Sequence, residues 1–152
     1  MRLVGHDGII ELSLVGYQFP HLATVPWDSN WLNVRVRVRH PRGDWTAQDP
    51  CLLTYDVAGL ADWLDAVAAG REENTEHGFM EPNLYFRSVT DPDGNRFVRV
   101  YFELELRPTW APFDGAPMED LYLDFPAEPS QLTKAAQSLR EQLAHYPQCT
   151  ER

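Results

Sequence analysis

The sequence predicts an α+β domain built mainly from antiparallel strands, and three observations lead to that fold class. Residues 32–39 alternate apolar and polar side chains with a period of two, as expected of a strand with one buried and one wet face. Several other segments show the same alternation, whereas only two show the three- and four-residue spacing of an amphipathic helix. Because strands and helices do not alternate regularly along the chain, a doubly wound parallel sheet is not expected.

The first strand is predicted from Ile9 to Tyr17, with the more apolar face at alternate positions that begin at Ile10. After an aperiodic loop, a second strand runs from about Trp31 to Arg39. The turn signal Pro41–Asp44 then leads to a returning strand over 45–48, and these two strands form a hairpin. Asp49-Pro50 is expected to end this strand before a short apolar stretch over 51–55.

The period changes to that of a helix after this stretch. Apolar residues recur at three- and four-residue spacing from Val57 to Ala68, which predicts an amphipathic helix. Asp56 is the expected N-cap, and Gly70 stands where the helix should stop. Arg71–Glu76 is predicted to be a polar loop.

Strands return in the second half of the chain. Asn83–Thr90 and Phe97–Arg107 flank the turn Asp91–Asn95, so they form a second hairpin. A long loop rich in proline precedes a short strand at 121–125. A terminal helix opens at Pro126–Ser130 and ends before Pro147, and its apolar stripe comprises Leu132, Ala135, Ala136, Leu139, Leu143 and Tyr146. The prediction is therefore two helices and about seven strands, arranged as a sandwich or a strongly curved sheet.

The composition is that of one globular domain over residues 1-152. Hydrophobic content is 43% and aromatic content is 12%, which is enough to bury a core. We find no secretory leader and no apolar stretch long enough to span a membrane, so we expect a cytoplasmic protein. Cys51 lies in an apolar run typical of a small core residue, and whether it pairs with Cys149 is left open.

The formal net charge of −10 is unevenly placed along the chain. Residues 1–50 hold five acidic and five basic residues, whereas residues 51–152 hold eighteen acidic and eight basic ones. Such a charge repels nucleic acid and anionic membranes, and it speeds encounter with basic partners. We therefore expect a basic protein partner, and neither nucleic acid nor membrane; simple solubility is the alternative explanation of the charge.

The only basic patch is an arginine stripe made of Arg35, Arg37, Arg39 and Arg42. Valines rather than aromatic residues interleave these arginines, so an RNA-binding site is disfavoured. A solvated sheet face is the preferred interpretation. If the two longest strands are neighbours, Glu103 and Glu105 pair with this stripe.

No motif indicates catalysis, a cofactor or a metal. The five histidines stand singly, no GxSxG or glycine-rich phosphate loop is present, and the cysteines lack the sequence context of catalytic thiols. We predict no catalytic residue, no metal ligand and no cofactor. The rival hypothesis is a small enzyme or ligand-binding protein with a pocket between sheet and helices, using His77, Glu81 or Asp91.

Two acidic groups form the candidate partner-binding surface, one on or just after the first helix and one near the last strand. They contain Asp56, Asp62, Asp65, Glu72, Glu73, Glu76, Asp114, Glu119, Asp120 and Asp124. The same carboxylates also suit a plain solvated surface that has no partner. Of the five tryptophans, most are expected in the core or at its rim, and one or two exposed beside acidic groups would serve as interface anchors.

Several short motifs, taken in chain order, resemble WapI-type immunity proteins. They are Gly16-Tyr17-Gln18-Phe19-Pro20, Trp27-Asp28-Ser29-Asn30-Trp31-Leu32, Trp45 with Asp49-Pro50, Thr54, Leu60 with Trp63-Leu64, and Glu81-Pro82-Asn83-Leu84-Tyr85-Phe86. The resemblance implies a small protein that binds and neutralises the toxic C-terminal domain of a polymorphic toxin, often a nuclease. It brings no contact residues with it, because the shared motifs are of structural types. The toxin's identity and the oligomeric state are left open.

Overall fold

The computed structural model describes residues 1–22, 25, 27–113 and 118–150. Within these residues, two helices accompany eight strands in two antiparallel sheets, so the predicted α+β class is confirmed. Sheet A contains, in spatial order, β1 (Arg2–Val4), β2 (Ile9–Tyr17), β3 (Trp31–Arg39) and β4 (Trp45–Leu53). Sheet B contains β5 (Glu76–His77), β6 (Leu84–Thr90), β7 (Arg96–Phe102) and β8 (Tyr122–Pro126). The helices are α1 (Thr54–Ala68) and α2 (Pro129–Leu143), and the short 3-10 turns are η1 (Asp28–Asn30) and η2 (Leu104–Leu106).

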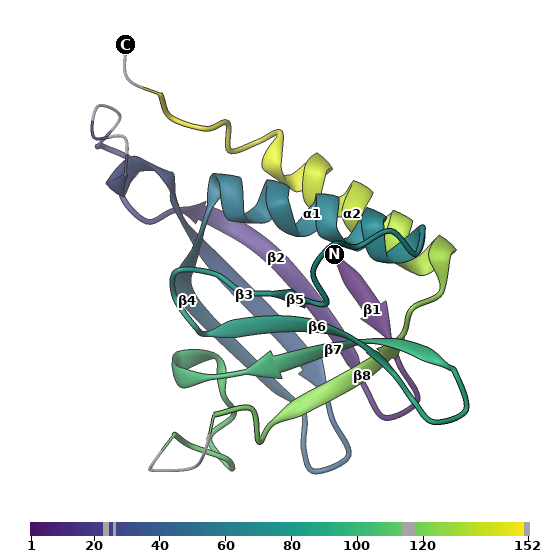
Figure 1. Cartoon of the computed structure of the whole chain (residues 1–152). Helices are drawn as coiled ribbons and strands as arrows, with labels where there is room; N and C mark the ends of the chain where they lie inside the picture. Colours follow the sequence, from purple (N-terminus) through teal and green to yellow (C-terminus); the bar gives the residue numbers. More distant parts are fainter. Residues whose placement is uncertain (23–24, 26, 114–117, 151–152) are drawn as a thin grey trace.

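The two sheets cross in space, and both helices lie side by side along one end of them (Figure 1). Helix α2 contacts β1 and β2 of sheet A. Helix α1 reaches sheet B through Trp63, whose ring lies 5.7 Å from that of His77 and 6.4 Å from that of Phe86. The helix pair therefore bridges the two sheets. In the described part of the chain, neither helix is long and apolar enough to cross a membrane.

The core is formed by the inward-facing side chains of every strand except β5. Val34, Val36 and Val38 on β3 are buried, whereas the arginines between them are exposed, as the period of two requires. On sheet B, Phe86 and Phe125 are fully buried. These residues belong to one continuous hydrophobic cluster that also holds the apolar stripes of both helices. Both sheets and the helix pair thus depend on the same buried volume.

The start of α1 differs from its prediction by three residues. Leu53 is the N-cap, and Asp56 lies three positions into the helix. The Asp56 carboxylate reaches back and accepts a hydrogen bond of 2.8 Å from the backbone N–H of Leu53. This hydrogen bond is one of the two that make up a capping box. Asp56 therefore still satisfies a backbone N–H at the start of the helix that has no partner within the helix. The predicted stop is confirmed, because Gly70 adopts a φ of 65° just beyond the last turn.

Strand β4 does not end at Asp49-Pro50 as predicted; it continues to Leu53. Pro50 pairs with Asn33, and the register shifts between Leu32 and Asn33. β4 is the edge strand of sheet A, so the N–H that proline lacks is not needed by another strand.

Strand β7 is shorter than predicted, because it ends at Phe102 and the chain turns into η2. Leu104 has a φ of 49°, which no continuing strand tolerates. The structure also adds β1 and β5, two short edge strands that the sequence pattern did not reveal. Segments of two or three residues are too short to display a period.

The turn between β1 and β2 packs against β8 without room for side chains. A Cβ on Gly5 would lie 2.4 Å from the backbone oxygen of Asp124. We therefore expect Gly5→Ala to destabilise the protein by about 1–3 kcal/mol in chemical denaturation. Gly59→Ala is the control, since its Cβ would meet only His77 at 3.7 Å and alanine favours a helix by about 0.5–1 kcal/mol. Equal stability of the two variants would contradict this packing.

Candidate protein interface

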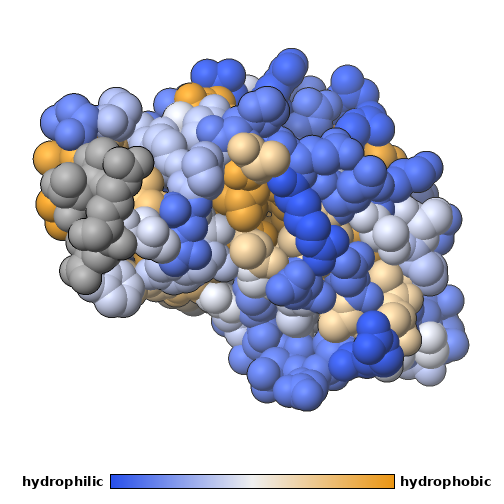
Figure 2. Space-filling view, turned by 90° about the horizontal axis from the view of Figure 1, so that it is seen from above, coloured by the Kyte–Doolittle hydropathy of each residue, from blue (hydrophilic) through white to orange (hydrophobic). Residues whose placement is uncertain are grey.

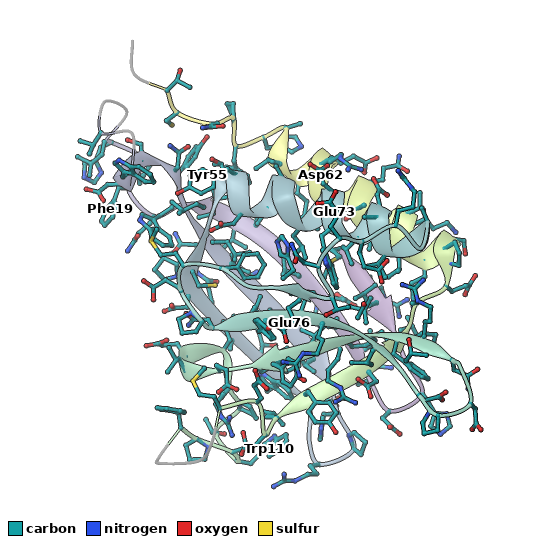
Figure 3. The ribbon with its side chains drawn as sticks, in the orientation of Figure 1. Phe19, Tyr55, Asp62, Glu73, Glu76 and Trp110 are labelled. Atoms are coloured by element: carbon teal, nitrogen blue, oxygen red, sulfur yellow. The ribbon has the colours of Figure 1, made fainter. Side chains whose placement is uncertain are left out.

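The carboxylates on α1 are tied to the second helix. Asp62 and Asp65 both pair with Arg140 of α2, at 2.8 and 2.7 Å. Figure 3 places Asp62 and Glu73 near the helix pair and Glu76 lower, on β5. Seen from above, the face that bears the helices is largely hydrophilic, with a small hydrophobic strip near its centre (Figure 2). The acidic side of α1 is therefore partly neutralised before any partner arrives.

The loop after α1 contains one engaged and one free carboxylate. Glu72 accepts a hydrogen bond of 3.0 Å from Ser88 and forms an ion pair with Arg96. Burial raises the pKa of Glu72, but hydrogen bonds from its own backbone N–H, Ser88 and Arg96 outweigh that effect and lower the pKa. Glu73 is exposed and makes no ion pair with another described residue. It is thus available to a partner without breaking an internal contact.

The outer face of sheet B joins the two acidic groups predicted from the sequence. Arg87 on β6 pairs with Glu76 at 2.8 Å and with Glu119 at 3.5 Å. Arg99, its neighbour on β7, holds Asp124 of β8 through two bonds of 2.7 and 2.9 Å. Three candidate carboxylates therefore meet on one face, although their segments are far apart in the sequence.

A row of tyrosines lies beside these charges. Tyr101 is in register with Tyr85 on one side and Tyr122 on the other, and neighbouring rings lie 5.6 and 5.5 Å apart. The Arg99 guanidinium sits 4.0 Å from the centre of the Tyr122 ring, and Arg87 lies over the other two rings. Cation–π contacts and ion pairs hold both arginines in place. Tyr101 itself is buried, so this face presents Tyr85, Tyr122 and the two arginines in a fixed arrangement.

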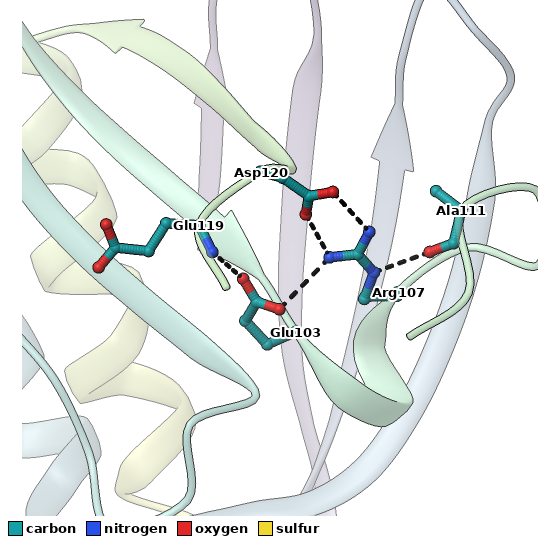
Figure 4. Close-up of polar contacts among 5 residues, drawn as sticks. All are labelled: Glu103, Arg107, Ala111, Glu119 and Asp120. Atoms are coloured by element: carbon teal, nitrogen blue, oxygen red, sulfur yellow. Dashed lines mark hydrogen bonds and ion pairs between the residues drawn. The ribbon is translucent and has the colours of Figure 1, made fainter. Parts of the chain in front are cut away.

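Behind this face, a buried ion network anchors the loop that leads to β8 (Figure 4). Arg107 bonds to Glu103 at 3.3 Å, to Asp120 at 2.7 Å and to the Ala111 carbonyl at 2.7 Å. Glu103, of which only 1% is exposed, also accepts a hydrogen bond of 2.6 Å from the backbone N–H of Glu119. The network fixes the chain around Glu119 and Asp120, and so positions the second acidic group.

Nine of the ten predicted partner-binding carboxylates lie among the described residues, and Asp114 lies outside them. Seven of the nine form ion pairs, with five arginines in total: Arg87, Arg96, Arg99, Arg107 and Arg140. The two acidic groups thus keep a net negative charge, but a smaller one than their carboxylates alone suggest. Sequence reasoning missed these arginine partners and the tyrosine row, because both depend on pairing between distant strands.

The arginine stripe on sheet A has a different environment from the one expected. Glu103 and Glu105 belong to the segment after β7, where Glu103 pairs with Arg107 and Glu105 accepts a hydrogen bond from Asn83, so they do not pair with it. Arg35 bonds to Gln48 at 3.2 Å, and Arg37 and Arg39 are exposed without an ion pair to another described residue. The prediction of carboxylate partners was therefore wrong, whereas the solvated sheet face is confirmed.

Of the three residues of the rival ligand-site hypothesis, His77 and Asp91 have local structural contacts and Glu81 is exposed. His77 lies between the rings of Trp63 and Phe79, and burial lowers its pKa. Asp91 accepts two hydrogen bonds from Asn95, of 2.8 and 2.9 Å, inside the β6–β7 turn. Both cysteines are free thiols, with Cys51 in the core as expected. Among the described residues, no group of three or more His, Cys, Asp or Glu side chains is placed to hold a metal ion.

A rigid sheet face rich in tyrosine and arginine, with carboxylates at its rim, has the composition typical of protein-binding surfaces. The comparison with protein families gives a more specific result. The chain belongs to the immunity protein WapI-like family, whose model matches residues 2–147. No curated protein and no solved structure matches the chain. The resemblance drawn from the short motifs is thus confirmed over nearly the whole sequence.

The buried ion network makes a prediction about stability. Arg107→Met leaves the Glu103 carboxylate buried without its cation, which costs about 3–5 kcal/mol for pairs of this kind. Urea denaturation measures the loss. Arg140→Met, at a partly exposed pair, is the control and should cost about 1 kcal/mol or less. Similar losses in both variants would show that burial of Glu103 is unimportant.

Asp120 provides a test through pH. The hydrogen bond from Arg107 holds the pKa of Asp120 below its ordinary range near 4. Its contribution to stability is therefore complete above that range and is lost as pH falls through the pKa of the folded protein. The stability difference between the wild type and Asp120→Asn should be constant above about pH 5 and shrink below about pH 4. A difference that persists unchanged into acid would contradict this assignment.

Proposed function

We propose that this protein is a non-enzymatic inhibitor, which binds the toxic C-terminal domain of a polymorphic toxin and neutralises it inside the bacterium that makes both. The observation that carries this proposal is membership of the WapI-like immunity family over residues 2–147. An immunity protein acts in the cytoplasm and needs neither a cofactor nor a catalytic group, since it works by occupying a surface of the toxin.

The proposed target is a basic toxin domain, most simply a nuclease. Nucleases bind phosphate and therefore carry positive surfaces, which a protein of net charge −10 attracts. The proposed docking surface consists of the acidic groups of residues 56–76 and 114–124, of which Asp114 lies outside the described residues. Support comes from the outer face of sheet B, where Glu76, Glu119 and Asp124 gather around fixed arginines. A surface held in one arrangement loses little entropy when it binds.

Co-expression with the product of the adjacent gene tests the proposal. We expect rescue from toxicity, a one-to-one complex, and an association rate that falls as salt rises, because charge attraction accelerates encounter. Rescue by no neighbouring product would remove the proposal's support. Binding that does not change with salt would contradict the electrostatic part alone.

Glu73→Lys tests the location of the acidic surface. Glu73 has no ion partner among the described residues, so charge reversal should leave folding intact and slow association about threefold to tenfold. Asp93→Lys, in the exposed β6–β7 turn, makes the same change of charge outside the proposed surface. Equal slowing in the two variants would indicate that only net charge matters.

A further inference from the structure

One end of the molecule displays an aromatic pair that the core does not need. Trp27 is 66% exposed, the largest value among the exposed hydrophobic side chains of the described residues. Its ring meets the ring of Tyr55, at the start of α1, edge to face with centroids 6.4 Å apart. Figure 3 shows Tyr55 at this end of the molecule. We call Trp27 and Tyr55 the aromatic corner.

The backbone beneath the aromatic corner is firmly held. The Asn30 side chain accepts hydrogen bonds from the Thr54 hydroxyl at 2.9 Å and from the Cys149 N–H at 2.8 Å. It also donates to the Cys149 carbonyl at 2.9 Å. Asn30 thus ties η1 to the start of α1 and to the C-terminal segment. Trp27, which precedes η1, is exposed above an ordered support, and such an anchor loses little entropy on binding.

Two carboxylates set the charge of the aromatic corner. Asp28 adjoins Trp27 and is exposed, and Asp56 adjoins Tyr55 and is half-buried. Neither forms an ion pair with another described residue. Exposed Trp and Tyr beside unpaired acids complement an apolar pocket with a basic rim. A second copy of this chain is a poorer match, because two molecules of charge −10 repel each other.

We propose that the aromatic corner is the anchor of the toxin interface, with Trp27 inserted into an apolar pocket rimmed by Lys or Arg on the toxin domain. This inference rests on the proposed function and adds the contact that dominates the affinity. The acidic groups accelerate encounter, whereas burial of Trp27 slows dissociation. The sequence predicts one or two exposed tryptophans beside acidic groups, and Trp27 is the residue that meets this description.

Titration of purified protein with the co-expressed toxin domain tests the anchor. Trp27→Ala should weaken binding about 30-fold to several hundred-fold, mainly through faster dissociation. Trp27→Phe should recover part of the loss, because it restores aromatic surface. The melting temperature should stay within about 2 °C of the wild type, since so exposed a side chain contributes little to the core.

Met80→Ala is the matched control, because Met80 is 65% exposed and lies outside the aromatic corner. We expect its affinity to stay within about threefold of the wild type. If the wild-type protein neither binds the toxin domain nor rescues cells from it, the proposed function itself is refuted. Wild-type binding that Trp27→Ala leaves unchanged refutes the anchor alone. Sedimentation gives a further check. If the wild type forms an oligomer that Trp27→Ala abolishes, and the affinity for the toxin domain is unchanged, the aromatic corner binds a second copy of this chain and the proposal is overturned.

Discussion

The burial of two sheet faces and a helix pair around one core is the constraint on which the rest of this structure depends. The longer strands point alternate side chains into that core, so the side chains between them lie on the outer faces of the sheets. On sheet B, the register then decides which outer residues meet: Arg87 lies beside Arg99, and Arg99 beside Asp124. The surface chemistry is thus a consequence of how the interior packs.

This constraint explains why an acidic protein has so few free carboxylates on its candidate surface. Arginines from neighbouring elements reach most of them, and the pairs hold side chains in single arrangements. Exposed pairs of this kind contribute little to stability. Under the proposed function their effect is on recognition, because the toxin domain would meet a patterned surface of charged and tyrosine side chains rather than a uniformly negative one.

The sequence predicted the parts of the fold that local patterns determine. The alternation in β2 and β3, the helical spacing of α1 and α2, and the turn with Gly94 at a φ of 86° all correspond to the structure. The strand through Pro50 was missed because an edge position tolerates what a central one does not. Two sheets were one of the two predicted arrangements, but which strands share a sheet was not predictable from local pattern, since placing β3 and β7 apart does not change the period of either strand.

The candidate site was less predictable for the same reason. The positions of the acidic residues could be read directly, but their partners come from other strands and the other helix, and pairing across long separations leaves no local signal. The η1 turn that follows Trp27 is held by Asn30 contacts with Thr54 and with Cys149, far along the chain. An aromatic residue such as Trp27 looks the same in the sequence whether its side chain is buried or exposed.

The uncompensated arginines of sheet A have a consequence for the molecule as a whole. Arg35, Arg37 and Arg39 outnumber Glu11, which lies in register with Arg37, so the outer face of sheet A has a sign opposite to that of the net charge. Separated charges of this kind give the molecule a dipole moment, and a charged body nearby exerts a torque on it. A diffusing molecule is therefore rotated before contact, so that a positive surface meets the pole remote from those guanidiniums. The uneven charge of the free protein thus determines how it turns towards a charged body before the two touch.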